Sequence, residues 1–111
     1  MNFEPHSSKT LHVTKYDNGD ISFIGTKENG TEYDGNIDWY CGQEQLIKGL
    51  CNYLCNFYVY VGWVSISDEK DMLIGYTNKC CFDIMFKKDS VTEFGFSLSD
   101  EQVRELLKFL L

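Results

Sequence analysis

Apolar and polar residues alternate near the amino terminus in the two-residue period of a β-strand. Leu11 and Val13 fall on one side of residues 11–16, and polar residues fall on the other. Residues 21–26 are rich in β-branched and aromatic types, which favours a second strand. Between the two lies Asn18-Gly19, a pair that suits the positive φ angles of a two-residue type I′ turn. The pattern predicts an amino-terminal β-hairpin.

The next segment repeats this arrangement and then changes. Asn29-Gly30 predicts a second hairpin turn, so residues 31–33 are expected to return as a short third strand. Asp34-Gly35 predicts a further turn, which leads into Asp38-Trp39-Tyr40.

From residue 43 to about residue 57 the apolar period becomes helical. Gly49 interrupts this pattern; a glycine inside a helix costs about 1 kcal/mol relative to alanine, so it indicates either a well-packed apolar face or a close approach to a neighbouring element. The apolar positions of this predicted central helix are Leu46, Ile47, Leu50, Leu54 and Phe57.

The second half of the chain predicts four strands and a final helix. Strands are expected at 58–66, 72–76, 80–86 and 92–98, with a turn at 87–90, and they form an antiparallel meander. Ser99 and Gln102 have the spacing of a capping box, and Leu98 and Val103 that of a hydrophobic staple. The helix that follows has one apolar stripe, formed by Val103, Leu106, Leu107 and Leu110.

Together these elements predict an α+β fold. We expect one antiparallel sheet of about five to seven strands, with two helices packed on it, in a single domain spanning residues 1–111 whose first eight residues are disordered. Apolar residues make up 43% of the chain and charged residues 24%, so there is enough apolar area for a core. No apolar stretch is long enough for a membrane span and the amino terminus lacks signal-peptide features, so a cytoplasmic location is expected.

The net charge of −7 is unevenly distributed. Residues 17–44 contain seven acids against Lys27 alone, a net charge of −6, and the remaining residues are nearly neutral. Such a segment attracts cationic surfaces and repels nucleic acid. Turn chemistry alone favours Asp17, Asp20 and Asp34, but it does not account for the scarcity of compensating cations.

Catalytic motifs are lacking in the sequence. Both histidines, His6 and His12, lie near the amino terminus without a local nucleophile signature, and no glycine-rich phosphate loop is present. Asp34, Asn36 and Asp38 have EF-hand spacing, but Trp39 stands where that loop needs glycine and Gln45 where it needs glutamate. We therefore expect no enzymatic activity, no cofactor and no metal.

The five cysteines are an odd number, which fits reduced thiols in a cytosolic protein. Cys51 and Cys55 share a face of the predicted helix, and Cys80 and Cys81 point to opposite sides of a strand. A zinc or thiol protein built from these residues is a minor alternative, since Cys-x-x-Cys pairs are absent.

In size and charge the chain is similar to the anti-CRISPR proteins of phages and to the immunity proteins of bacterial toxins. This resemblance implies a small inhibitor that docks on a basic, nucleic-acid-handling partner such as a nuclease, without binding nucleic acid or membrane itself. No signature motif accompanies the resemblance, so it transfers no site residues.

From the residues themselves we predict that Trp39 and Tyr40 act as interface anchors, with the surrounding carboxylates guiding the partner to the surface, although Trp39 is equally suited to a core position. The predicted partner-binding residues are Asp17, Asp20, Glu28, Glu32, Asp34, Asp38, Trp39, Tyr40 and Glu44.

A homo-oligomeric structural or adaptor module is the main alternative. An exposed edge strand would join its subunits, or else a group of aromatic residues. The sequence is compatible with a monomer or a homodimer. The aromatic group consists of Tyr53, Tyr58, Tyr60 and Trp63.

Overall fold

The fold consists of two antiparallel sheets and two helices. The computed structural model describes residues 1–3, 10–27, 29–37, 43–55, 62–65, 71–77, 81–88 and 91–111. The first sheet has the order β1 (Asn2–Phe3), β2 (Thr10–Lys15), β3 (Ile21–Thr26) and β4 (Glu32–Ile37). The second has the order β5 (Gly62–Ser65), β6 (Asp71–Thr77), β7 (Cys81–Lys88) and β8 (Val91–Leu98). The helices are α1 (Glu44–Leu54) and α2 (Asp100–Leu110).

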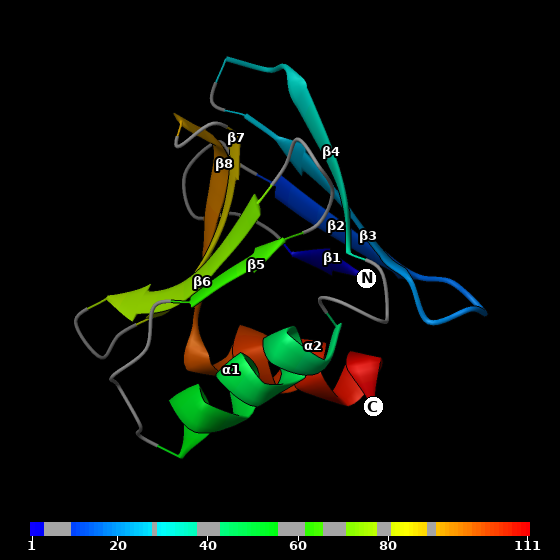
Figure 1. Ribbon diagram of the computed structural model, residues 1–111, viewed down its shortest axis with the longest axis vertical. Helices are drawn as coiled ribbons and strands as arrows, with labels where there is room; N and C mark the ends of the chain where they lie inside the picture. Colours follow the sequence, from blue (N-terminus) through cyan, green and yellow to red (C-terminus); the bar gives the residue numbers. More distant parts are fainter. Residues whose placement is uncertain are drawn as a thin grey trace.

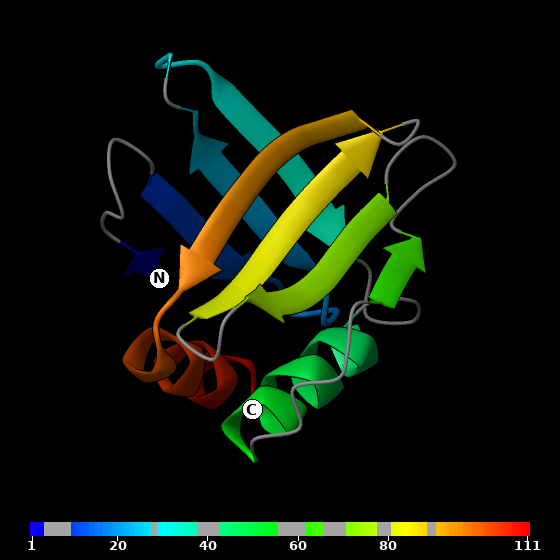
Figure 2. The same ribbon diagram turned by 90° about the vertical axis from the view of Figure 1, so that its left-hand side faces the viewer.

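The two sheets pack face to face, and their strands cross one another (Figures 1 and 2). Both helices lie at one end of this pair of sheets; α1 contacts α2 and β6, and α2 contacts β7 and β8. The predicted α+β class is confirmed. The prediction of a single sheet is wrong, because each set of strands has one apolar face and the two faces cover each other. Among the described residues, no helix has the length and apolar character needed to cross a membrane.

Both hairpins of the first sheet use a three-residue loop. In the first, the Gly19 amide donates to the Tyr16 carbonyl and the Tyr16 amide donates to the Asp20 carbonyl, with Gly19 at φ 91°. This is a type I turn followed by a bulge in the left-handed region, so the predicted type I′ turn is wrong in type although the hairpin is present. Gly30, at φ 86°, occupies the same position in the second hairpin.

The predicted turn at Asp34-Gly35 is also wrong, because both residues lie inside β4. Along this strand Tyr33, Gly35 and Ile37 point inward, and the residues between them point outward. A β-carbon at Gly35 would lie 2.8 Å from the Tyr33 ring, so the glycine provides the space that this ring occupies. A residue type that is common in turns is therefore used here for close packing within a strand.

The other element boundaries agree closely with the sequence pattern. The central helix ends at Leu54, with Cys55 as its C-cap, and residues 56–57 of the predicted helix lie outside the described residues. The four-strand meander is confirmed, although β7 continues to Lys88, so residues 87 and 88 of the predicted turn at 87–90 are in a strand and residues 89–90 lie outside the described residues. Ser99 begins α2 with the predicted capping box: its hydroxyl accepts from the Gln102 amide at 3.3 Å, and the Gln102 side chain accepts from the Ser99 amide at 3.0 Å.

Aromatic rings fill the space between the two sheets. Phe86 of β7 lies with its ring centroid 5.3 Å from Phe23 and 5.1 Å from Tyr33. Phe94 of β8 stacks on Tyr33 at 5.6 Å with an interplanar angle of 4°. These contacts hold β3 and β4 of the first sheet against β7 and β8 of the second. The core therefore continues from one sheet to the other and on to both helices.

A tyrosine connects the two helices. Tyr53, near the end of α1, is buried, and its hydroxyl donates a 2.5 Å hydrogen bond to the Asp100 carboxylate in the first turn of α2. Its ring also packs edge-on against Phe82 of β7 at 5.7 Å. Because it is buried, Tyr53 cannot belong to the exposed aromatic group that was predicted to join the subunits of a homo-oligomer. Tyr58 and Tyr60 lie outside the described residues.

Replacing Tyr53 with phenylalanine is expected to lower the free energy of unfolding by about 1 kcal/mol, because the change removes this hydrogen bond and leaves the ring in place. Urea unfolding followed by circular dichroism measures the loss. Tyr16→Phe is the matched control, since Tyr16 is 51% exposed and its change is expected to have little effect. Equal stability of the two variants would show that the Tyr53 hydroxyl does not stabilise the contact between the helices.

Candidate binding surface

The candidate surface is the outer face of the first sheet, together with the turn between β2 and β3. The strand pattern defines this face, because the alternate residues of β2, β3 and β4 point into the core. In Figure 1 the first sheet lies on the opposite side of the molecule from the second, so this face is directed away from the second sheet. Its residues are Thr10, His12, Thr14, Ile24, Thr26, Glu32, Asp34 and Asn36; Ser22 occupies the same face of β3 but is buried.

Strand register arranges these side chains in rows across the sheet. His12, Ile24 and Asp34 form one row, because Ile24 pairs with His12 on one side and with Asp34 on the other. Thr10, Thr26 and Glu32 form the next row toward the β3–β4 turn, and the hydroxyls of Thr10 and Thr26 hydrogen-bond at 3.0 Å. The carboxylates of β4 therefore lie along one side of a mixed polar and apolar face.

Two of the predicted carboxylates come together on β4. Glu32 and Asp34 are both exposed and point outward from the strand at the edge of its sheet. They are two residues apart, which places them about 7 Å apart along the strand. Charged side chains are a common protection of sheet edges, so Glu32 and Asp34 also disfavour pairing of this edge strand with other chains.

The turn carboxylates lie at the other end of the sheet. Asp17 is exposed and Asp20 half-buried, and the Asn18 side chain holds the turn by accepting from the Asp20 amide at 3.0 Å. Pairing of β3 with β4 places this turn beside Ile37 and away from Glu32, about 17 Å distant along a six-residue strand. The predicted acidic group is therefore divided between two ends of the sheet.

Two lysines moderate the local charge. Lys15 is the last residue of β2, next to the turn acids, and Lys27 follows β3 at the end where Glu32 lies. Among the described side chains of the first sheet and its turns, four carboxylates thus stand against two ammonium groups. The surface remains acidic, but less so than the sequence count of one lysine predicts.

The other predicted site residues are less closely connected to this face. Glu44 is exposed in the first turn of α1, outside the sheet. Glu28, Asp38, Trp39 and Tyr40 lie outside the described residues, so their part in the surface stays a prediction.

The sequence analysis missed one residue of this surface. Ile24 is 37% exposed in the middle of the outer face, between the row partners His12 and Asp34. Its signal in the sequence was the run Ile21-Ser22-Phe23-Ile24, in which alternation places Ile24 opposite the buried Phe23. An exposed apolar residue surrounded by polar ones is suited to contact with another protein.

The cysteines and acids form no metal site in the part of the chain that the structure describes. No three His, Cys, Asp or Glu side chains gather there in a suitable arrangement. Cys51 and Cys81 are half-buried, Cys55 is exposed, and none of the three is in a disulfide. The Asp83 carboxylate, which is buried in the second sheet, accepts from the Ser97 hydroxyl at 2.5 Å.

Comparison with known proteins adds no further residues to this surface. No protein-family model matches the chain, and no curated protein matches it. The candidate surface therefore depends on the geometry of the first sheet alone.

Proposed function

We propose that the protein is a small, non-enzymatic inhibitor that binds a larger basic partner, a nuclease or another nucleic-acid-handling protein, through the outer face of its first sheet. The observation that carries the proposal is the pair of exposed carboxylates, Glu32 and Asp34, on one outward face of an edge strand. The turn acids Asp17 and Asp20 would also contact the partner and extend the contact to the other end of the sheet.

The spacing of the carboxylates supports a match to a nucleic-acid groove. On β4 the carboxylates of Glu32 and Asp34 lie about 7 Å apart along the strand, whereas one DNA strand has a phosphate for about every 3.4 Å of helix axis. The spacing of this pair is therefore close to that of every second phosphate along the axis. A groove that binds phosphates with Lys and Arg would accept the pair at two such positions.

The distribution of charge supports association with a cationic surface. Most of the net charge of −7 comes from residues 17–44, and the described part of this segment lies in the first sheet, its turns and the start of α1. A field of this kind raises association rates with a basic partner by roughly 10- to 1,000-fold and weakens as salt increases. Ile24 would supply apolar contact near the centre of the same face.

Reversing both charges of β4 should weaken partner binding strongly. The Glu32→Lys/Asp34→Lys variant is expected to lose at least about 10-fold in affinity for a basic partner, because attraction becomes repulsion along the β4 side of the contact. Its thermal stability should change little, since both side chains are exposed. The measurement is capture of host proteins on the immobilised chain at low and high salt, followed by binding and activity assays of each retained nucleic-acid-handling protein.

Glu101→Lys/Glu105→Lys on α2 is the matched control. Both residues are exposed, and the change in net charge is the same, but the location is different. We expect this control to bind and inhibit the partner nearly as wild type does. Equal loss in both variants, or no retained basic partner whose activity falls, would contradict the proposal. A salt-resistant dimer in light scattering, without such a partner, would instead favour the homo-oligomeric module.

A further inference from the structure

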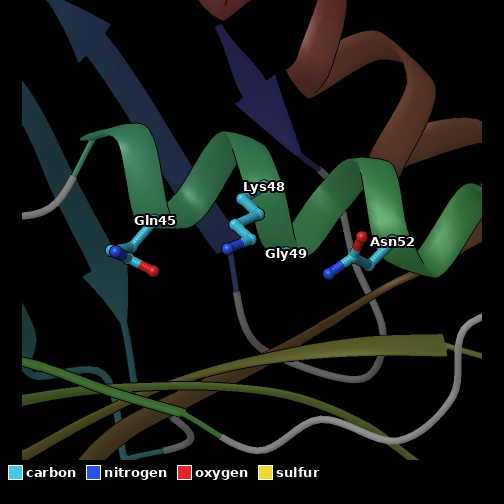
Figure 3. Close-up of a pocket in the computed structure, with 4 residues that line it drawn as sticks. All are labelled: Gln45, Lys48, Gly49 and Asn52. Carbon is cyan, nitrogen blue, oxygen red and sulfur yellow. The ribbon is translucent and has the colours of Figure 1, made fainter.

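A hollow lies beside α1, on a face of the helix that adjoins its buried face. Its volume is about 220 Å³, and the described residues that line it are Gln45, Lys48, Gly49 and Asn52. Figure 3 shows the three longer side chains extending from the same side of the helix, toward the strands drawn below it. One water molecule needs about 10–15 Å³ of such volume, so the hollow has room for several waters or for a small molecule.

The spacing of these residues explains why they meet. Positions 45, 48, 49 and 52 follow the i, i+3, i+4, i+7 pattern, which places them on one face over two turns. The buried Leu46, Leu50 and Tyr53 occupy the adjoining face, and Gly49, which is also buried, lies at the boundary between the two faces. A whole polar face of α1 therefore lines the hollow.

Gly49 contributes to the space. It is a buried residue in the middle of a helix, where alanine would be more favourable by about 1 kcal/mol. Because it has no side chain, the helix backbone itself forms part of the wall between Lys48 and Asn52. A small residue is suited to a position where a ligand approaches the backbone.

The chemistry of the lining favours an anion. Lys48 supplies an ammonium group with three donors, and the amides of Gln45 and Asn52 each supply two more. No carboxylate is among the described lining residues. Although Glu44 stands four residues before Lys48, no ion pair joins Lys48 to another described residue.

We propose that this hollow binds a small oxyanion, a carboxylate or a phosphate, with Lys48 as its charge partner and Gln45 and Asn52 as hydrogen-bond donors. The site is separate from the outer face of the first sheet and does not depend on the proposed inhibitor function. Its volume is below that of a drug-sized pocket, so the ligand is a simple anion or the anionic end of a larger molecule.

Titration of the isotope-labelled protein with inorganic phosphate and, separately, with acetate tests the site, with sodium chloride holding the ionic strength constant. We expect saturable shifts of the amide signals of α1 and of the Gln45 and Asn52 side chains. Lys48→Gln should weaken binding about 10- to 100-fold, as expected for loss of a hydrogen bond to a charged group. Asn52→Asp should weaken it as well, because the near-isosteric change places a carboxylate in the hollow.

Lys108→Gln is the control, since it removes an equal charge from the exposed side of α2. We expect it to bind as wild type does. Whichever of phosphate and acetate binds more tightly shows whether the natural ligand is a phosphate or a carboxylate. The proposal is overturned if neither anion gives saturable shifts, if chloride gives the same shifts, or if Lys48→Gln and Lys108→Gln weaken binding equally.

Discussion

Alanine at position 25 is expected to lower the free energy of unfolding by about 3 kcal/mol or more, although it adds a single methyl group. Gly25 lies in β3 and faces the second sheet, where a β-carbon would be 2.2 Å from the Phe94 ring. Phe94 has little freedom to move away, because its ring is stacked on Tyr33 at 5.6 Å. The added methyl group therefore has to separate the two sheets locally. Urea unfolding followed by circular dichroism measures the effect.

Two further variants distinguish this cause from a general intolerance of alanine. At Gly95, in β8, a β-carbon would be 3.7 Å from the Met85 side chain, which is ordinary contact, so Gly95→Ala should cost less than about 1 kcal/mol. Combining Gly25→Ala with Phe94→Leu should recover part of the loss, with a coupling energy of roughly 1–3 kcal/mol. If Gly25→Ala and Gly95→Ala were equally stable, the close packing of the sheets at Gly25 would be disproved.

Elements that are determined by residues close together in the sequence were predictable. The start of α2 is set by Ser99 and Gln102, which satisfy each other's backbone amides within one turn, so four residues of sequence are enough to find it. The strands of the meander follow from their β-branched and aromatic composition in the same way. At the ends that the structure describes, errors in these elements were limited to one or two residues, as at Lys88, while residues 58–61 and 66 of the first predicted strand lie outside the described residues.

Features that depend on packing between distant segments were not predictable. Gly35 looked like a turn residue, because the sequence does not show that the Tyr33 ring needs the space above it. The division into two sheets was missed for a similar reason: an alternating strand shows that one face is buried, but not whether a helix or another sheet covers it. Gly19 indicated a hairpin, yet a positive φ there suits both the type I′ turn and the three-residue loop that the structure has.

The candidate surface was predictable in composition but not in arrangement. A count of charges along residues 17–44 treats the acids as one group, and it omits Lys15, which stands just before that segment. Strand pairing decides the arrangement, because it brings Glu32 and Asp34 to one face and sends the turn acids to the far end. Ile24 was missed because exposure of an apolar residue depends on which face of the sheet is covered.

Phe86 packs in the core against β4, the strand that presents Glu32 and Asp34. Replacing Phe86 with alanine is expected to lower the free energy of unfolding by about 3–5 kcal/mol. Its side chain is completely buried, and its ring lies within 5.3 Å of Phe23 and 5.1 Å of Tyr33. A domain of this length typically has a stability of about 6–17 kcal/mol, so the loss would be a large part of the total. Urea unfolding measures it, with Phe109→Ala as the control, because Phe109 is only partly buried at the edge of the core.

The same variant should also loosen β4, since Tyr33 faces Phe86 from the inner side of that strand while Glu32 and Asp34 lie on its outer side. Amide hydrogen exchange is therefore expected to accelerate more in residues 32–37 than in α2, because local stability follows the contacts that a segment makes. If the loss of stability in Phe86→Ala did not exceed that in Phe109→Ala, the aromatic cluster between the sheets would not be the principal contact that holds them together. If exchange rose equally in β4 and α2, the rings would stabilise the whole fold without specifically fixing the strand that presents the carboxylates.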